Sequence, residues 1–230
     1  MSTGKAGPGD SLPLETIAAT LAPFRLSLSE SQLGAVRQYV DLLLEWNKSI
    51  NLTAIEGKIE VLSRHFGESF FAASALDIEQ CRLADVGTGA GFPGLALKIA
   101  CPAMDLTLFE SNARKCAFLR EVSQRLGLTG VDIRRERYEE SSDSGQGFDF
   151  VCARALGDYP AFLPWARTAL KPRGRVALWL GTDESIRIGR RKEFIWDAPT
   201  PIPESRRRVI LVGRPIKTQE IVSRETIEPR

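Results

Sequence analysis

The sequence predicts an α/β chain in which a small helical region precedes a doubly wound, mostly parallel sheet. Three observations predict it. The apolar spacing is helical before residue 76, short apolar runs alternate with helical segments after it, and a glycine-rich turn joins the first of these runs to a helix. With 230 residues and 43% hydrophobic side chains, the chain can bury a core without a disulfide or a metal.

The helical region is expected at residues 12–76. An intermittent apolar pattern with intervals of three and four places one set of side chains on the same helix face: Leu33, Val36, Val40, Leu43, Leu44 and Trp46. Ser29 or Ser31 is expected to cap this helix, because a serine hydroxyl can accept a hydrogen bond from a free backbone amide in the first turn. Residues 1–11 are rich in Gly, Ser and Pro and are expected to be disordered.

The sheet is expected at residues 77–214. Five strand-like runs lie at 83–87, 105–110, 131–137, 148–155 and 175–181, and helical segments at 94–100, 112–127 and 159–170 separate them. Strands and helices that alternate at this spacing form parallel pairs.

Two further strands are expected at 193–198 and 206–214. Only the turn PTPIPES separates them, which leaves no room for a crossover helix, so the seventh strand should pair antiparallel. Residues 215–230 have alternating charges and few large apolar side chains, and a flexible tail is expected there.

Composition excludes several classes of protein. The four cysteines never approach CxxC spacing and the chain has one histidine, so no Cys/His metal site is expected. No apolar run approaches the roughly 20 residues that span a bilayer, and the first residues lack the pattern of a signal peptide. We expect a cytoplasmic chain that acts as a monomer, with no metal and no membrane partner.

The net charge is +2, but the basic residues gather late in the sequence. Residues 185–230 contain eleven basic and six acidic side chains, a local surplus of +5. A phosphate-rich partner fits such a surplus, and a solvated basic tail is the alternative reading. The basic rim expected here consists of Arg187, Arg190, Arg191, Lys192, Arg206, Arg207 and Arg208.

The sharpest local motif is DVGTGAGFPG, residues 85–94, which follows an apolar strand and opens a helix. Gly87, Gly89 and Gly91 remove side chains where the backbone must turn sharply and where a ligand must approach the amides. A cofactor that carries a ribose docks at this place in such a sheet, and Glu110 ends the next strand as a ribose-binding acid should.

A nicotinamide cofactor satisfies part of this pattern. Gly89, Gly91 and Gly94 form GxGxxG, and Glu110 follows Gly89 by 21 residues. Two features favour S-adenosylmethionine instead. The carboxylate of Asp85 can hold the amino group of that cofactor but would repel a pyrophosphate, and the chain leaves too little sequence for a separate substrate domain of the dehydrogenase type.

The chain resembles the GidB family, the bacterial small-subunit ribosomal RNA guanine-N7 methyltransferases, over roughly residues 30–214. The combination of the glycine turn with WNKSINLT and CARA is more specific than the turn alone. The segments that carry the resemblance are LLEWNKSINLTAI (43–55), RHFGES (64–69), DVGTGAGFPGLALKI (85–99), FESNARKCAFLRE (109–121), RYEE (137–140), FDFVCARA (148–155) and RRRVILVGR (206–214).

The resemblance implies the Rossmann-like fold of S-adenosylmethionine-dependent methyltransferases and the transfer of a methyl group to N7 of one guanine in 16S ribosomal RNA. The partner is then 16S ribosomal RNA or the small ribosomal subunit. The implied cofactor-binding residues are Asp85, Gly87, Thr88, Gly89, Gly91, Phe92, Glu110, Arg137, Tyr138, Glu139 and Arg154. The implied RNA-binding residues are Arg137, Arg154 and Arg207. Lys115, one turn into its predicted helix, is a further candidate for contact with RNA phosphate, and a solvated lysine is the alternative.

The sequence departs from the family's pattern at three positions. The mildest departure is Glu110, where the family often has aspartate. Glu68 stands where the family usually has aspartate in RHxxDS. Leu180 stands where the family has a lysine before the glycine that ends the fifth strand, which removes one expected cation from the substrate face.

The expected chemistry needs no general base, because guanine N7 carries a lone pair and no proton; positioning and exclusion of water then suffice. Arg154 is the candidate catalytic residue, since an arginine there ends the fourth strand beside the crevice. A structural pair of Arg154 with Asp158 or Glu110 is the alternative. His65 is expected to pack against the cofactor-binding part rather than act as a base, and Cys152 to be a buried thiol.

Three other functions remain open on the sequence. One is a small-molecule methyltransferase, which should carry an apolar lid over its substrate. Another is a ribosome-assembly protein that keeps the fold without activity. Such a protein has no physical need for the three glycines of the turn together with Glu110 at the end of the next strand. The third is a dehydrogenase, which would bind nicotinamide.

Overall fold

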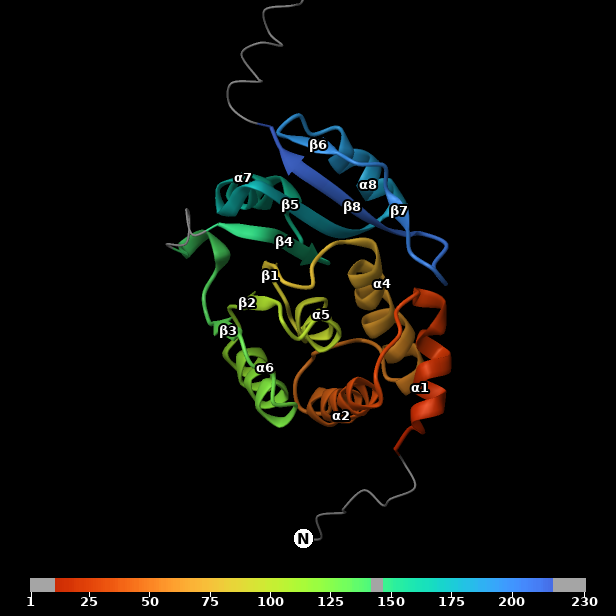
Figure 1. Cartoon of the computed structure of the whole chain (residues 1–230). Coiled ribbons are helices and arrows are strands. Elements are labelled where there is room, and N and C mark those ends of the chain that lie inside the picture. Colours follow the sequence, from red (N-terminus) through yellow and green to blue (C-terminus); the bar gives the residue numbers. More distant parts are fainter. Residues whose placement is uncertain (1–10, 142–146, 217–230) are drawn as a thin grey trace, which may run out of the picture.

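An eight-stranded sheet runs through the molecule in a computed structural model that describes residues 11–141 and 147–216 (Figure 1). The strands lie in the order β3-β2-β1-β4-β5-β8-β6, and β7 pairs with β8 beside that path. Their bounds are β1 Arg82–Val86, β2 Asp105–Phe109, β3 Val131–Arg134, β4 Phe148–Arg154, β5 Leu170–Gly181, β6 Phe194–Trp196, β7 Thr200–Pro201 and β8 Arg208–Pro215.

Strands β1 to β5 pair in parallel, whereas β8 runs antiparallel to both β5 and β6. The expected doubly wound sheet with an antiparallel last strand is therefore confirmed, and all seven expected strands are present. The eighth, β7, lies inside the segment expected to be only a turn. Two residues are too few to leave an alternating pattern in the sequence.

Helices cover both faces of the sheet. Their bounds are α1 Leu14–Leu21, η1 Ala22–Phe24, α2 Glu30–Asn47, α3 Lys58–Val61, a π-helix (η2) at Leu62–Gly67, α4 Glu68–Ala75, α5 Gly94–Ala100, α6 Ala113–Arg125, η3 Tyr138–Glu140, α7 Tyr159–Ala169 and α8 Thr182–Gly189. Helix α8 was not expected from the sequence, although Asp183 and Glu184 in its first turn are typical of a helix start.

Strands β1, β2 and β4 are buried on both faces, and the side chains of the central strands alternate between two hydrophobic clusters. Leu83, Phe150 and Trp179 belong to the cluster beneath α2, α4, α5 and α6, whereas Ala84 and Val151 belong to the cluster beneath α7 and α8. Figure 1 shows the same division, with α1, α2, α4 and α5 gathered on one side of the sheet. Burial on both faces explains why the strands read as short, nearly continuous apolar runs.

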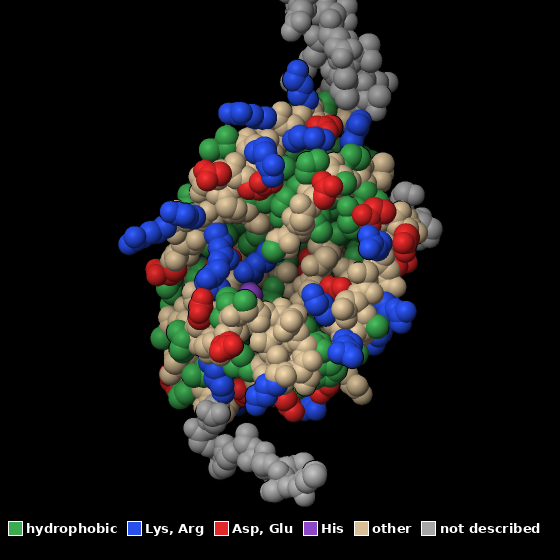
Figure 2. Space-filling model, turned by 180° about the vertical axis from the view of Figure 1, so that it is seen from behind, with side chains coloured by type: hydrophobic (Ala, Val, Ile, Leu, Met, Phe, Trp, Pro, Cys, Tyr) green, Lys and Arg blue, Asp and Glu red, His purple; other side chains and the backbone are tan. Residues whose placement is uncertain are grey.

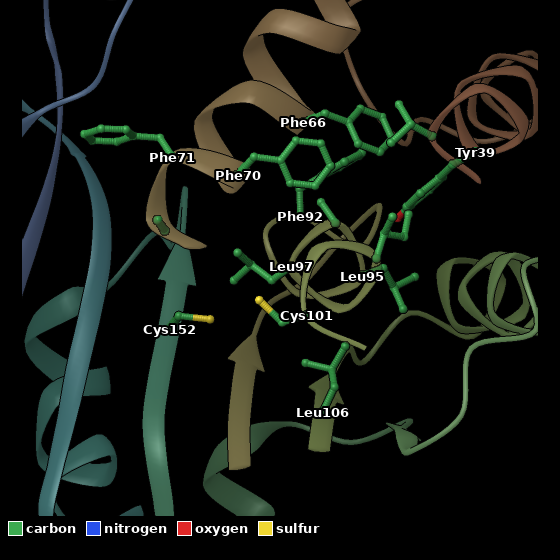
Figure 3. Packing of buried hydrophobic residues seen from close by; sticks show 14 of the residues in the cluster. Tyr39, Phe66, Phe70, Phe71, Phe92, Leu95, Leu97, Cys101, Leu106 and Cys152 are labelled. Carbon is green, nitrogen blue, oxygen red and sulfur yellow. The ribbon is translucent and has the colours of Figure 1, made fainter. Parts of the chain in front are cut away.

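The N-terminal helices share a core with the sheet. Ser29 caps α2 in a capping box with Gln32, as one of the two expected caps. Tyr39 of α2 is fully buried, and its hydroxyl donates to the carbonyl of Ala90 in the glycine turn at 2.6 Å. Figure 3 shows Tyr39, Phe66 and Phe92 converging from three different segments.

Several expectations concern residues outside the described part of the chain. Residues 1–10 and 217–230 are most of the two ends expected to be disordered or flexible. The boundary expected at residue 214 differs slightly, because β8 continues to Pro215 and the Ile216 amide donates to the Glu193 carbonyl at 3.1 Å.

Within the described residues, all four cysteines are buried and carry free thiols. Over the same ranges, no group of His, Cys, Asp and Glu is arranged to hold a metal ion, and no helix is long and apolar enough to cross a membrane.

Substitution of two glycines in the turn can distinguish backbone strain from steric clash. Gly89 (φ 58°) and Gly91 (φ 86°) both adopt left-handed conformations. A Cβ on Gly91 would lie 2.2 Å from the Tyr39 hydroxyl, whereas one on Gly89 would meet nothing closer than 3.9 Å.

We therefore expect Gly91→Ala to lower the free energy of unfolding by about 3 kcal/mol and Gly89→Ala by about 1 kcal/mol. Urea unfolding of both variants measures the difference. Equal losses would mean that Tyr39 does not restrict this position.

Candidate cofactor crevice

The carboxylate of Asp85 lies at the end of β1, fully buried under the glycine turn. Its Oδ2 accepts a hydrogen bond from the Thr88 hydroxyl at 2.6 Å and one from the Gly94 amide at 2.8 Å. The three turn glycines, Gly87, Gly89 and Gly91, all have positive φ, which lets the chain fold back over the strand end. The turn therefore fixes one carboxylate at the carboxyl edge of the sheet, where ligands bind in this class of fold.

Burial raises the pKa of Asp85 to about 6, although the bonds from Thr88 and Gly94 and the charge of Arg154 oppose the rise. Cys152 faces Asp85 from the neighbouring strand β4. Burial and the charge of Asp85 raise the pKa of the Cys152 thiol well above its ordinary value. Cys152 is thus a neutral thiol rather than a thiolate nucleophile, in agreement with the sequence.

A cleft of about 310 Å³ opens beside Gly87 and brings together residues from four separate segments. It is lined by Gly87, Phe109, Glu110, Ser111, Glu136, Arg137, Tyr138, Glu139, Leu156 and Asp158. Five of these were expected to bind the cofactor: Gly87, Glu110, Arg137, Tyr138 and Glu139. Strand β3 ends at Arg134, earlier than expected, and this releases Arg137 and Tyr138 into the loop beside the cleft.

The side chains of the cleft fit the adenosine part of S-adenosylmethionine. Glu110 accepts hydrogen bonds from the Gly89 amide at 3.1 Å and the Asn112 amide at 2.8 Å, which hold its carboxylate at the edge of the turn. The ring of Tyr138 packs against Trp165, with centroids 5.1 Å apart. Burial raises the pKa of Tyr138 to about 12, so it presents a neutral phenol. A carboxylate suits the ribose hydroxyls, and the aromatic and aliphatic surface suits a purine.

The other expected cofactor residues lie outside the cleft lining. Thr88 and Gly91 face inward, toward Asp85 and Tyr39. Phe92 is buried and stacks on His65 and Tyr39, with centroids 4.7 and 5.3 Å apart. These residues support the turn on the side that faces the N-terminal helices.

His65 lies in the π-helix and is a packing residue, as expected. Its Nε2 lies 2.8 Å from the Thr53 hydroxyl, and its ring stacks on Phe92. Burial, with the charges of Arg154 and Arg64, lowers the pKa of His65 to about 3. The imidazole is therefore neutral at physiological pH.

Arg154 ends β4, and its guanidinium is engaged by the N-terminal helices. Its Nη2 donates to the carbonyl of Arg64 at 2.9 Å and lies 3.3 Å from Oε2 of Glu68. The alternative pair with Asp158 or Glu110 is wrong, because Glu68 is the carboxylate that reaches it. In the sequence Glu68 stands out only as a departure from the family's motif, and no local pattern links it to a strand so far along the chain.

Basic side chains gather around a hollow on one face of the molecule (Figure 2). A cleft of about 390 Å³ lies between the N-terminal helices and the β7–β8 turn. It is lined by Phe24, Ser63, Arg64, Glu68, Pro203, Glu204, Ser205, Arg206, Arg207 and Arg208. Three members of the expected basic rim lie here, whereas Arg187 and Arg191 form ion pairs with Glu184 and Glu193. Lys115 lies apart, half-buried in the first turn of α6.

A larger hollow of about 930 Å³ lies at the opposite edge of the sheet, among Asp149, Lys171 and Arg175. It contains none of the expected site residues. The carboxyl edge, with Asp85 and the glycine turn, is the better candidate for the site.

Comparison with known proteins identifies the family. The model of the GidB family, rRNA small subunit methyltransferase G, matches residues 32–195. The chain belongs to the GidB family. It is 34% identical over 215 residues to the ribosomal RNA small subunit methyltransferase G of Bacillus subtilis, covering 87% of this chain and 90% of that one. Its identity to the protein of the same name from Chloroflexus aggregans is 35% over 185 residues, covering 79% and 76%.

Solved structures agree on the fold of this GidB-family chain. A SAM dependent methyltransferase from Aquifex aeolicus matches with a TM-score of 0.58 at 15% identity, covering 68% of this chain and 93% of that one. A ribosomal protein L11 methylase from Lactobacillus delbrueckii matches with a TM-score of 0.56 at 17% identity, covering 67% and 80%. The expected Rossmann-like methyltransferase fold is thus confirmed.

His65 is buried in its neutral form, and this makes the free energy of unfolding depend on pH. Because folding lowers the pKa of His65 from 6.5 to about 3, the unfolded chain binds a proton in this window that the native chain does not. The free energy of unfolding should therefore fall as the pH drops below 6.5.

We expect His65→Gln to remove this part of the pH dependence, so that the stability difference between wild type and variant changes by about 2 kcal/mol between pH 7 and pH 5. Urea unfolding at each pH measures it. Asp85 is present in both proteins, so its opposite contribution cancels. A difference that is the same at both values of pH would contradict a neutral, buried His65.

Proposed function

We propose that this GidB-family chain transfers the methyl group of S-adenosylmethionine to N7 of a specific guanine in 16S ribosomal RNA. The observation that carries the proposal is the buried carboxylate of Asp85 under the glycine turn, beside a cleft with Glu110 and Tyr138. The names of the relatives in Bacillus subtilis and Chloroflexus aggregans support ribosomal RNA of the small subunit as the substrate.

Each cofactor group has a partner in the crevice. Asp85 would hold the amino group of the methionine part, and Glu110 would accept hydrogen bonds from the ribose hydroxyls. Tyr138 and the segment with Arg137 and Glu139 would lie beside the adenine. Thr88, Gly89, Gly91 and Phe92 would act by fixing the shape of the turn. The bound cofactor supplies an activated methyl group on a sulfonium.

The chain itself needs only to orient the base and exclude water, because N7 has a free lone pair and no proton to lose. The described residues of the crevice agree with this requirement. His65 is neutral and bonded to Thr53, and Cys152 is a protonated thiol. Arg154 at the end of β4 remains the proposed catalytic residue, through its charge beside the reacting groups.

The RNA would approach over the basic side chains at the carboxyl edge. Arg137 and Arg207 are exposed, Lys115 is half-buried, and Arg154 lies at the end of β4 in contact with Glu68. The target guanine must leave its stack to present N7 inside the crevice, so recognition would combine phosphate contacts with shape. We propose that the chain acts as a monomer in the cytoplasm, on 16S ribosomal RNA or on the assembled small subunit.

The direct test incubates the chain with labelled S-adenosylmethionine and either free 16S ribosomal RNA or small-subunit particles, and then maps the modified nucleotide. We expect label at N7 of one guanine. Label in a small molecule only would support a small-molecule methyltransferase. Binding of particles without label would support an assembly protein. Either result contradicts the proposal.

The basic cleft yields a second prediction. Arg206 and Arg207 are exposed in it, so Arg206→Ala with Arg207→Ala should weaken RNA binding. The slope of log affinity against log salt should decrease in magnitude by about 1.4, or about 0.7 for each lost phosphate contact on a single strand. Filter binding at several salt concentrations measures the slope.

The matched control removes the same charge from the opposite edge of the sheet. Arg173 and Arg175 are also exposed, and they line the hollow at that edge. Arg173→Ala with Arg175→Ala should leave the slope unchanged. Equal effects of the two double variants would mean that RNA affinity reflects net charge and not the cleft.

A further inference from the structure

The sheet register pairs Asp85 with Cys152 of β4, and Arg154 follows Cys152 by two residues, so both β4 side chains lie on the same face of the sheet as Asp85. Asp85 and Arg154 are close enough for the charge of each to act on the pKa of the other. Yet no hydrogen bond or ion pair joins them in the part of the chain that the structure describes; Oδ2 of Asp85 is bonded to Thr88 and Gly94 instead. An arginine beside a buried carboxylate would ordinarily pair with it, since both charges lose their hydration on burial.

The guanidinium of Arg154 contacts Glu68 and the backbone of the N-terminal helices. Oε2 of Glu68 lies 3.3 Å from Nη2 of Arg154, the same nitrogen that donates to the Arg64 carbonyl. The side chain of Glu68 is only 4% exposed, and the same Oε2 accepts a hydrogen bond from Nη1 of Arg208 at 2.9 Å. Its backbone carbonyl accepts from Nε1 of Trp179 at 2.9 Å. Glu68 is therefore fixed by α4, β5 and β8, and it is the carboxylate that Arg154 contacts.

We propose that Glu68 is a positioning residue, which draws the guanidinium of Arg154 away from Asp85 and so keeps Asp85 open to the cationic amino group of the cofactor. The inference rests on the proposed function, because it assigns that group to Asp85. It adds a role for a buried side chain of α4 that acts on Asp85 through Arg154.

Among the described residues, Arg154 is the cation whose charge acts on the pKa of Asp85. Besides Arg154, the charged and titratable groups that act on it in the described residues are Cys152 on β4 and Tyr39 on α2. Burial raises the pKa of both, so both are neutral. Without the carboxylate of Glu68, Asp85 becomes the nearby anion left for Arg154, and attraction at this depth is weakly screened. The cofactor would then have to displace an internal ion pair.

The test uses Glu68→Gln, Arg154→Gln and the double variant of the full chain, with two readouts. Calorimetry measures affinity for S-adenosylmethionine, and a carbon-13 NMR titration without cofactor measures the pKa of Asp85. We expect Glu68→Gln to lower the pKa of Asp85, because Arg154 closes on it, and to weaken cofactor binding about tenfold. In the Arg154→Gln background, Glu68→Gln should change neither quantity.

The control is Asp149→Asn, which breaks the 2.8 Å ion pair with Lys171 at the opposite edge of the sheet. It should leave both readouts unchanged. Should Glu68→Gln not fold, Glu68→Asp keeps the charge but withdraws it by one methylene, and the pKa of Asp85 should then fall by a smaller amount. An unchanged pKa of Asp85 in the folded variant, or effects of the two substitutions that simply add, would overturn the inference.

The outcomes separate this inference from the proposed function. Failure of the wild type to bind S-adenosylmethionine would defeat the proposed function, while the titration without cofactor would still report on Glu68. Tight binding by the wild type and by Glu68→Gln alike would defeat the inference alone.

Discussion

The buried carboxylate of Asp85 is the constraint on which the crevice depends. A charged group buried at the carboxyl edge of the sheet loses its hydration, and two hydrogen bonds from the turn offset only part of that loss, since burial still raises the pKa of Asp85 to about 6. The geometry of the turn follows from it. Gly94 must bring its amide to the carboxylate, and a side chain there would lie 2.7 Å from Oδ2. The turn thus holds the Asp85 carboxylate where hydrogen bonds replace only part of its lost hydration. A cationic ligand bound there would stabilise the carboxylate further.

The N-terminal helices supply the wall behind this turn. Tyr39 bonds to the Ala90 carbonyl, and Phe92 lies between the rings of Tyr39 and His65. Glu68 joins the same helices to the ends of β4 and β8 through Arg154 and Arg208. One buried cluster spans these helices and the sheet. The helical region is thus part of the construction of the site, and a change in its packing would reach the crevice directly.

The sequence predicts those features that depend on local patterns. The strands, the antiparallel end of the sheet and the glycine turn with Asp85 and Glu110 all follow from short-range periodicity and turn chemistry. The pair between Glu68 and Arg154 does not, because it joins a helix to a strand end far along the chain. The contact of Tyr39 with Gly91 is not predictable for the same reason. The sequence suggests that Gly91 faces a ligand, whereas in the structure the absence of a side chain there makes room for Tyr39. Elements as short as β7 leave too little pattern to detect.

A crystal structure with S-adenosylmethionine tests the central claim most directly. The account predicts the methionine amino group within hydrogen-bond distance of Asp85, the ribose hydroxyls on Glu110, and Arg154 still engaged by Glu68. A cofactor bound elsewhere, or bound here with Asp85 paired to Arg154 instead of to the ligand, would contradict it.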